Sequence, residues 1–308
     1  DNMNFIEVKD VVKQYDGHRA LDHVTLDVGE GQVYGLLGPN GAGKTSLIRI
    51  LNHITRPDSG EVYLAGKPLT ASEVRHIGYL PEERGLYKKM KVLDQIVYLG
   101  RLKGMSKNDA RTSALRWLER FELTEWSNRK IETLSKGMAQ KVQFISTVVH
   151  SPRLLILDEP FSGFDPVNTE QLKREILNLH RDGATILFST HNMASVEEVC
   201  DDITLINNAK VVLQGNVHEI RQQFKKNLFT LHIAEPVLAP NESLYSLESI
   251  EKHPMSGSVA VIRLKPGVTM REVVDQLNRE YTLLGFDELL PTMNEIFIET
   301  VTQGDGQK

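Results

Sequence analysis

The stretch from Gly38 to Ser46, which reads GPNGAGKTS, constrains the fold of this chain more than any other. It contains a glycine, four further residues and then Gly43, Lys44 and Thr45, which is the pattern of a phosphate-binding loop. The glycines allow backbone N–H groups to approach phosphate oxygens, Lys44 adds a positive charge, and the Thr45 hydroxyl is a candidate ligand of Mg²⁺. The pattern predicts a nucleotide site made by Gly38, Pro39, Asn40, Gly41, Ala42, Gly43, Lys44, Thr45 and Ser46.

The residues around this loop favour the same interpretation. Residues 33–37 are typical of a buried strand, and residues 46–51 of a helix whose N-terminus points at the phosphates. The alternative is a glycine-rich turn that binds nothing. A strand before the loop and a helix after it argue against that alternative.

Composition is that of a globular protein that can bury a full core. The chain has 308 residues, of which 40% are hydrophobic and 25% charged. No apolar run reaches the roughly 18 residues that a membrane helix needs, and we expect no signal peptide. The single cysteine, Cys200, excludes an internal disulfide and is typical of a reducing cytoplasm.

Charge is distributed unevenly along the chain. Residues 227–308 contain six Lys and Arg against twelve Asp and Glu, a net charge of −6, and the remaining residues carry a net +1. Neither part has the basic excess typical of a nucleic-acid-binding protein. No nucleic-acid partner is therefore expected.

The apolar pattern predicts two domains. In residues 3–226 we expect strands at 5–8, 24–28, 33–37, 61–65 and 76–81, helices within 91–150, and then alternating strands and helices. The later strands are predicted at 154–157, 184–189, 203–206 and 211–213. Residues 227–304 are predicted to form a small α+β domain with strands at 228–233 and 259–264, a helix at 269–281 and a final helix capped by Thr292.

Two acidic residues follow the apolar run at 154–157. Asp158 is predicted to hold Mg²⁺ directly or through water, and Glu159 to polarise a water that attacks the γ-phosphate. His191 follows the next strand at the same edge of the sheet, where open α/β sheets bind their ligands. Glu159 and His191 are therefore the candidate catalytic residues.

With these features in order, the chain resembles the nucleotide-binding subunit of an ABC transporter over about residues 3–224. Residues 134–138 match the family's LSGGQ signature at Leu134, Ser135 and Gly137. Residues 161–165, which end at Asp165, match the loop after the catalytic strand, and residues 189–191 match the switch-histidine motif. Tyr15 is at the position where the family stacks adenine, although from the sequence alone it is equally a half-buried packing residue.

The resemblance implies an α/β fold, a P-loop NTPase cassette with a RecA-like core, an antiparallel β subdomain and a helical subdomain. It also implies an ATPase that uses ATP and Mg²⁺ and works as a head-to-tail dimer. In that dimer Ser135, Gly137 and Asp165 belong to the nucleotide site, with Ser135 and Gly137 touching the partner's nucleotide. The partners implied are an integral membrane permease and a second copy of the chain or a paralogous ATPase, at the cytoplasmic face of the cell membrane.

The sequence departs from the family in two places. Lys136 and Met138 replace a glycine and a glutamine of the signature, and Glu82 replaces a glutamine that the family usually has. We expect Glu82 to be a third metal ligand, with Thr45 and Asp158; the alternative is a side chain that points to solvent and serves the permease interface. The segment around Glu82 and the C-terminal domain are similar to a bacterial exporter subset that includes sodium-efflux ATPases.

A soluble ABC ATPase that acts on ribosomes or DNA is the main alternative. Translation-associated members carry two cassettes, whereas this chain has one, and DNA-repair members carry long coiled coils, whereas this sequence has no sustained heptad run. A GTPase is disfavoured because the sequence contains no NKxD motif. The C-terminal domain is alternatively a regulatory module that binds a ligand.

Overall fold

The computed structural model describes the main chain of residues 4–83, 85–253 and 257–305. The chain divides into two compact units, the first ending at Val217 and the second beginning at His218. The predicted domain boundary at residues 226 and 227 differs from this division by the placement of one short helix, α7 (Val217–Gln223). That boundary stays a prediction, and a truncation tests it below.

The first unit begins with an antiparallel sheet of order β2-β1-β4-β5. Its strands are β1 (Asn4–Tyr15), β2 (His18–Gly29), β4 (Ser59–Leu64) and β5 (Lys67–Pro68). β1 and β2 are much longer than the predicted strands at 5–8 and 24–28. Irregular pairing between Val8 and Val11, beside a positive φ at Asp10, interrupts the alternation of apolar residues and hides the continuation of the strand.

A six-stranded sheet of order β10-β9-β3-β8-β7-β6 forms the centre of the first unit. Strands β9, β3, β8, β7 and β6 run parallel, and β10 pairs antiparallel with β9. Every residue of β3, β7 and β8 is buried, as expected for strands that are covered on both faces. The six strands are β3 (Val33–Leu37), β6 (Ile77–Leu80), β7 (Leu154–Asp158), β8 (Thr185–Thr190), β9 (Asp202–Asn207) and β10 (Lys210–Asn216).

Helices cover this sheet. Helix α1 (Lys44–Leu51) shares one apolar cluster with strands of both sheets, through Leu47 and Ile48. Helices α5 (Pro166–Arg181) and α6 (Met193–Val199) follow β7 and β8, and η1 (Glu73–His76) precedes β6. Helix α6 ends at Val199 because Cys200 has extended backbone angles.

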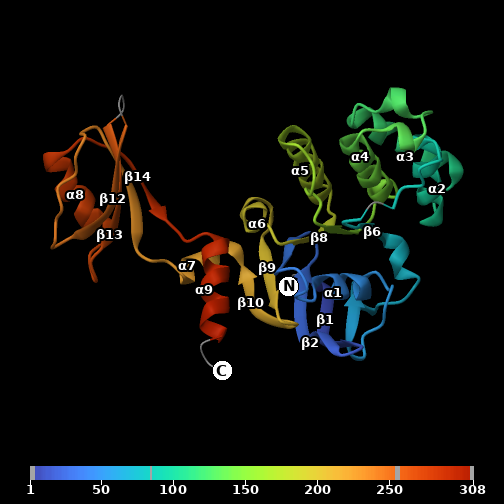
Figure 1. Ribbon diagram of the computed structural model, residues 1–308, viewed down its shortest axis with the longest axis horizontal. Coiled ribbons are helices and arrows are strands. Elements are labelled where there is room, and N and C mark those ends of the chain that lie inside the picture. Colours follow the sequence, from blue (N-terminus) through green and yellow to red (C-terminus); the bar gives the residue numbers. More distant parts are fainter. Residues whose placement is uncertain (1–3, 84, 254–256, 306–308) are drawn as a thin grey trace. The chain divides into compact units, whose positions relative to one another are not determined.

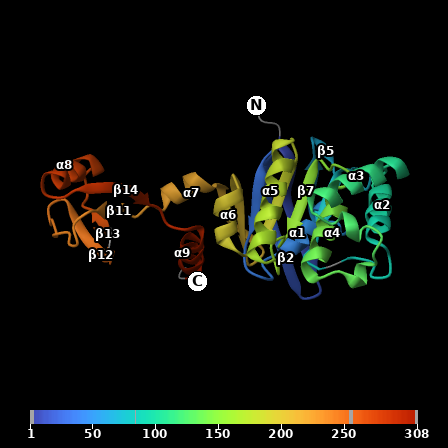
Figure 2. The ribbon, with the colours of Figure 1, turned by 90° about the horizontal axis from the view of Figure 1, so that it is seen from above.

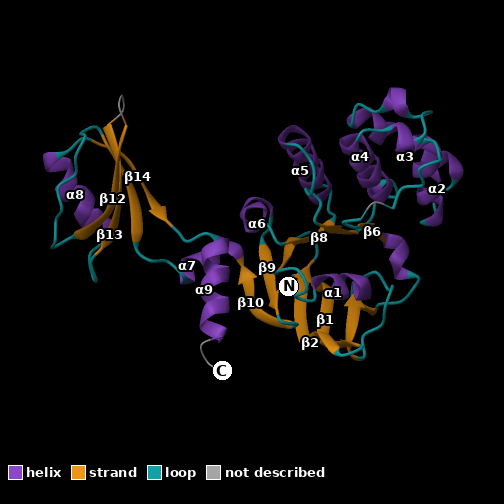
Figure 3. Ribbon diagram, viewed as in Figure 1, coloured by secondary structure: helices purple, strands orange, loops and turns teal. Residues whose placement is uncertain are grey.

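Three helices form a group of their own in Figures 1 and 3, and the view turned by 90° in Figure 2 shows the same group. They are α2 (Val92–Leu102), α3 (Lys107–Arg120) and α4 (Lys136–Val148), joined by the short turns η2 (Thr124–Trp126) and η3 (Ile131–Thr133). Trp117, Phe121 and Phe144 pack their rings together at their centre. Ser106 and Ser135 cap α3 and α4 by accepting backbone N–H groups.

The second unit contains an antiparallel sheet of order β12-β13-β11-β14 with its own apolar core. Its elements are β11 (Leu228–Ile233), β12 (Tyr245–His253), β13 (Gly257–Leu264), α8 (Met270–Glu280), β14 (Leu283–Leu289) and α9 (Met293–Asp305). Val273 and Leu277 of α8 pack against Leu231 and Ile262. The capping side chain of Thr292 is confirmed, since it exchanges hydrogen bonds with Glu295.

Among the residues that the structure describes, no helix has both the length and the apolar character that crossing a membrane requires.

Candidate nucleotide-binding and catalytic site

The phosphate loop joins the end of β3 to the start of α1. Gly38 has φ 146°, and a Cβ there would lie 2.1 Å from the carbonyl oxygen of Ile206. Gly43 has φ 119°, and a Cβ there would lie 2.3 Å from the carbonyl oxygen of Ala20. Only glycine fits either position, so the loop has the shape that the sequence predicts.

Lys44 lies inside this loop and is only 6% exposed. Its ammonium donates to the carbonyl oxygens of Gly38, at 2.6 Å, and Pro39, at 3.1 Å. Burial lowers the pKa of Lys44, and the carboxylates of Glu159, Asp158 and Glu82 oppose that shift. The loop therefore holds a buried cation beside backbone N–H groups, an arrangement suited to a phosphate chain.

Asp158 ends β7 and is 6% exposed. Burial raises the pKa of its carboxyl group, and the nearby charges of Glu159 and Glu82 act in the same direction. Lys44 provides an opposing positive charge. A buried carboxylate in this setting is stabilised by a further cation.

Glu159 follows directly, with a positive φ of 48°, and its side chain is 11% exposed. Its carboxylate accepts hydrogen bonds from the Thr190 hydroxyl at 3.0 Å and from the backbone N–H of His191 at 2.8 Å. The Nδ1 atom of His191 lies 2.6 Å from the same carboxylate. The structure thus brings the two predicted catalytic residues, Glu159 and His191, into direct contact.

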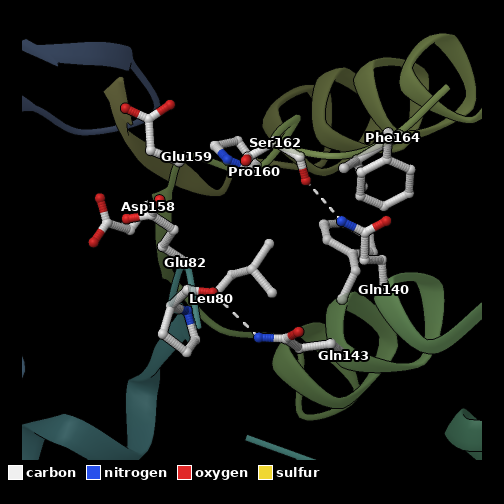
Figure 4. Close-up of a pocket in the computed structure, with 12 residues that line it drawn as sticks. Leu80, Glu82, Gln140, Gln143, Asp158, Glu159, Pro160, Ser162 and Phe164 are labelled. Carbon is white, nitrogen blue, oxygen red and sulfur yellow. Dashed lines mark hydrogen bonds between the residues drawn. The ribbon is translucent and has the colours of Figure 1, made fainter. Parts of the chain in front are cut away.

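Glu82, Asp158 and Glu159 line a small cavity of about 30 Å³. Figure 4 shows these three acids on one side and Gln140 and Gln143 on the other, with Gln140 donating to the carbonyl oxygen of Ser162. Gln143 donates to the carbonyl oxygens of Pro81 and Glu83, and so fixes the segment that carries Glu82. Within the described residues no set of three or more His, Cys, Asp or Glu side chains has the geometry of a metal site.

Comparison with known proteins assigns the family. The chain is 42% identical over 296 residues to the uncharacterized ABC transporter ATP-binding protein YhaQ of Bacillus subtilis, covering 96% of this chain and 98% of that protein. The chain belongs to the ABC transporter ATP-binding proteins. The family model described as ABC transporter matches residues 21–162, and the model for the C-terminal domain of DrrA1-3-like ATP-binding proteins matches residues 215–301.

Two further proteins are similar to this chain at lower sequence identity. The daunorubicin/doxorubicin resistance ATP-binding protein DrrA of Streptomyces peucetius is 32% identical over 74% of this chain and 70% of its own length. The dimeric structure of the bacterial ABC transporter cassette MJ0796 is 26% identical with a TM-score of 0.63, over 69% of this chain and 98% of that one. The predicted fold class, the ATPase activity and the role as an ABC transporter subunit are confirmed. The alternative of a soluble ABC ATPase for ribosomes or DNA is thereby disfavoured.

The phosphate loop and His191 do not line this cavity, and neither do the remaining predicted residues of this ABC ATPase. Ser135 caps α4, Gly137 lies in its first turn, and Asp165 caps α5 by accepting the N–H of Asn168. Tyr15 is 40% exposed, and the Lys13 ammonium lies 5.5 Å from its ring centroid. None of these four lines the cavity that holds Asp158 and Glu159, so their contacts with nucleotide stay predictions.

The sequence did not identify the two glutamines on α4 or Thr190 as site residues. Gln140 and Gln143 line the cavity from α4, and a polar side chain on each of two adjacent turns of one helix was the available signal. Thr190 lies within the motif at residues 189–191, which predicts a role for His191 alone, yet its hydroxyl donates directly to Glu159.

Proposed function

We propose that this chain is the ATP-hydrolysing subunit of an exporter, that it acts as a head-to-tail dimer, and that a separate membrane-spanning protein carries the substrate. The observation that carries this proposal is the meeting of the phosphate loop, Asp158, and the Glu159–His191 pair at one edge of one sheet. Two of the relatives support it, because DrrA is named for drug resistance and MJ0796 forms a dimer. The subunit then works at the cytoplasmic face of the cell membrane, with a second copy or a paralogous ATPase.

Each residue has a role in this reaction. The Lys44 ammonium exchanges two backbone carbonyl partners for the β- and γ-phosphates. Glu159 polarises the attacking water. Nδ1 of His191 contacts Glu159, so Nε2 is the nitrogen left for the γ-phosphate, and it donates to a phosphate oxygen only when it carries a proton.

The second copy completes the nucleotide site. Ser135 and Gly137, at the N-terminus of α4, contact the nucleotide of the opposing subunit, and Asp165 supports the same interface. The half-exposed ring of Tyr15 stacks on adenine.

The chemical types of the side chains near the phosphate loop suit Mg²⁺. Three carboxylates, Glu82, Asp158 and Glu159, gather beside one lysine, and Mg²⁺ prefers hard oxygen ligands. Thr45 and Asp158 would hold the ion, with Glu82 as a direct or water-bridged ligand. The ion would neutralise charge on the β- and γ-phosphates.

The Glu159→Gln variant tests the catalytic assignment. It keeps the shape of the side chain but is a poor base, so turnover should fall by about 10²–10⁴-fold while ATP affinity stays unchanged. With ATP, the variant should also accumulate as a dimer on size-exclusion chromatography. Glu170→Gln, at an exposed acid on α5, is the matched control. Wild-type turnover in Glu159→Gln would remove Glu159 from catalysis.

A co-purification experiment tests the transport role. A tagged chain extracted in mild detergent should retain one integral membrane protein in stoichiometric amount. Recovery with ribosomes or DNA in place of a membrane protein would contradict the exporter proposal and leave the ATPase chemistry untouched.

A further inference from the structure

The carboxylate of Glu159 is held by two consecutive residues at the end of β8. Oε1 accepts the backbone N–H of His191 at 2.8 Å and lies 2.6 Å from His191 Nδ1. Oε2 accepts the hydroxyl of Thr190 at 3.0 Å. Each oxygen of the carboxylate therefore has a separate partner, and the plane of the group is fixed.

A second hydrogen bond of Thr190 determines that its hydroxyl donates to Glu159. The backbone N–H of Asn192 donates to Thr190 Oγ1 at 3.0 Å, so this hydroxyl is already an acceptor. Its own proton is then free to go to Glu159 Oε2. Thr190 is 3% exposed, which leaves little room for water to replace it.

The acceptor sites of Glu159 can be counted. An ionised carboxylate has about four lone-pair sites, of which Thr190 and His191 use three. The remaining site lies on Oε2, the oxygen that Thr190 holds. A water polarised by Glu159 therefore binds to an oxygen whose orientation Thr190 sets.

We propose that Thr190 is a positioning residue for ATP hydrolysis: its hydroxyl orients Glu159 Oε2 so that the remaining acceptor site is presented to the attacking water. The inference rests on the proposed role of Glu159 as the group that polarises this water. It assigns Thr190 a part in turnover and none in the binding of ATP.

The test compares Thr190→Val, which has the same shape and no hydroxyl, with Thr190→Ser, which keeps the hydroxyl. Loss of a hydrogen bond to a charged group should lower kcat about tenfold or more in Thr190→Val, with the KM and the directly measured Kd for ATP unchanged. Thr190→Ser should restore most of the turnover. The matched control is Thr185→Val, because Thr185 is buried on the same strand and also accepts a backbone N–H, from Gly31.

A second arm separates positioning from a structural role. In the Glu159→Gln background, adding Thr190→Val should change the residual turnover by less than about twofold, since the oxygen that Thr190 orients is no longer a base. Thr190→Ala serves in both backgrounds if Thr190→Val melts below the Thr185→Val control. Two outcomes would overturn the role of Thr190 and leave that of Glu159 in place. Either Thr190→Val loses no more turnover than Thr185→Val, or Thr190→Val lowers turnover by the same factor in the wild-type and Glu159→Gln backgrounds. Wild-type turnover in Glu159→Gln alone would instead overturn the proposed function.

Discussion

Glu82 brings a charge to a position next to Asp158, a carboxylate that the fold already buries. The pKa of Asp158 is raised first by its burial and then by the neighbouring acids Glu159 and Glu82. A glutamine at position 82 would add no charge and would offer both a donor and an acceptor. A carboxylate at this position is best explained by a cation that neutralises it, which is the basis of the proposed Mg²⁺ role of Glu82.

Glu82→Gln should raise the Mg²⁺ concentration needed for half-maximal hydrolysis by roughly tenfold, which is typical of losing a group that supports a metal. The measurement is a Mg²⁺ titration of ATPase activity at saturating ATP. Glu83→Gln, the next acid on the same segment, is the control and should leave the titration unchanged. An unchanged titration and ATP affinity in Glu82→Gln would contradict the ligand role and leave the alternative, in which Glu82 points to solvent and serves the permease interface.

At the scale of elements, capping side chains fix the residues at which helices begin. Ser106 precedes α3, accepts the N–H of Asp109 at 3.1 Å and donates to the carboxylate of the same residue at 2.6 Å. Ser106→Ala should therefore cost about 1 kcal/mol, which lowers the Tm of the first unit by about 2–4 °C. Ser127→Ala, at a half-buried serine outside any helix, is the control for thermal melting followed by circular dichroism. Equal melting of both variants would show that this cap contributes nothing.

The elements that the sequence predicted well are those with one unambiguous signal. β3 and β7 are continuous apolar runs, and the phosphate loop needs its glycines, so each was located within a residue or two. β12 and β14 were missed. β12 reads YSLESIEKH, in which a register shift between Leu247 and Ser249 interrupts the alternation of apolar residues, and β14 contains a glycine and two acids. β14 pairs with β11, which lies far earlier in the chain, so local propensity gives no warning of it, whereas β12 forms a hairpin with β13, the strand that follows it.

The same limit applies to the candidate site. The sequence was enough to predict that Asp158, Glu159 and His191 share one edge of the sheet, because each follows the end of a predicted parallel strand. The bond from Thr190 to Glu159 was not predictable, because it depends on a positive φ at Glu159 that turns the carboxylate towards β8. Backbone angles of this kind leave no trace in the residue types around them.

At the scale of the whole molecule, each unit has its own apolar core, and the second unit carries the negative charge. A net charge of −6 makes residues 227–308 a poor ligand for anionic lipid headgroups. We therefore expect the second unit to support dimer contacts or regulation and not to bind the bilayer. The alternative of a ligand-binding regulatory module is compatible with the same charge.

A chain truncated after Asn227 should fold and bind ATP with an affinity within about twofold of the full chain, because the first unit has its own apolar core. Thermal melting and titration with a fluorescent ATP analogue measure the two properties, with the full chain as reference. An unfolded product would show that the proposed boundary at residues 226 and 227 is wrong.

Strand β3, which precedes the phosphate loop, pairs with strands that are synthesised much later in the chain. β3 lies between β8 and β9, and Val33 pairs with Ile186, 153 residues later in the chain. Pairings between such distant segments are slow to form, because closing the loop costs entropy before any contact is gained. During synthesis the apolar segment 33–37 therefore leaves the ribosome with no sheet to join, and the finished site depends on residues near 190. A chaperone that shields this segment during translation would act at the most exposed stage in the life of the protein.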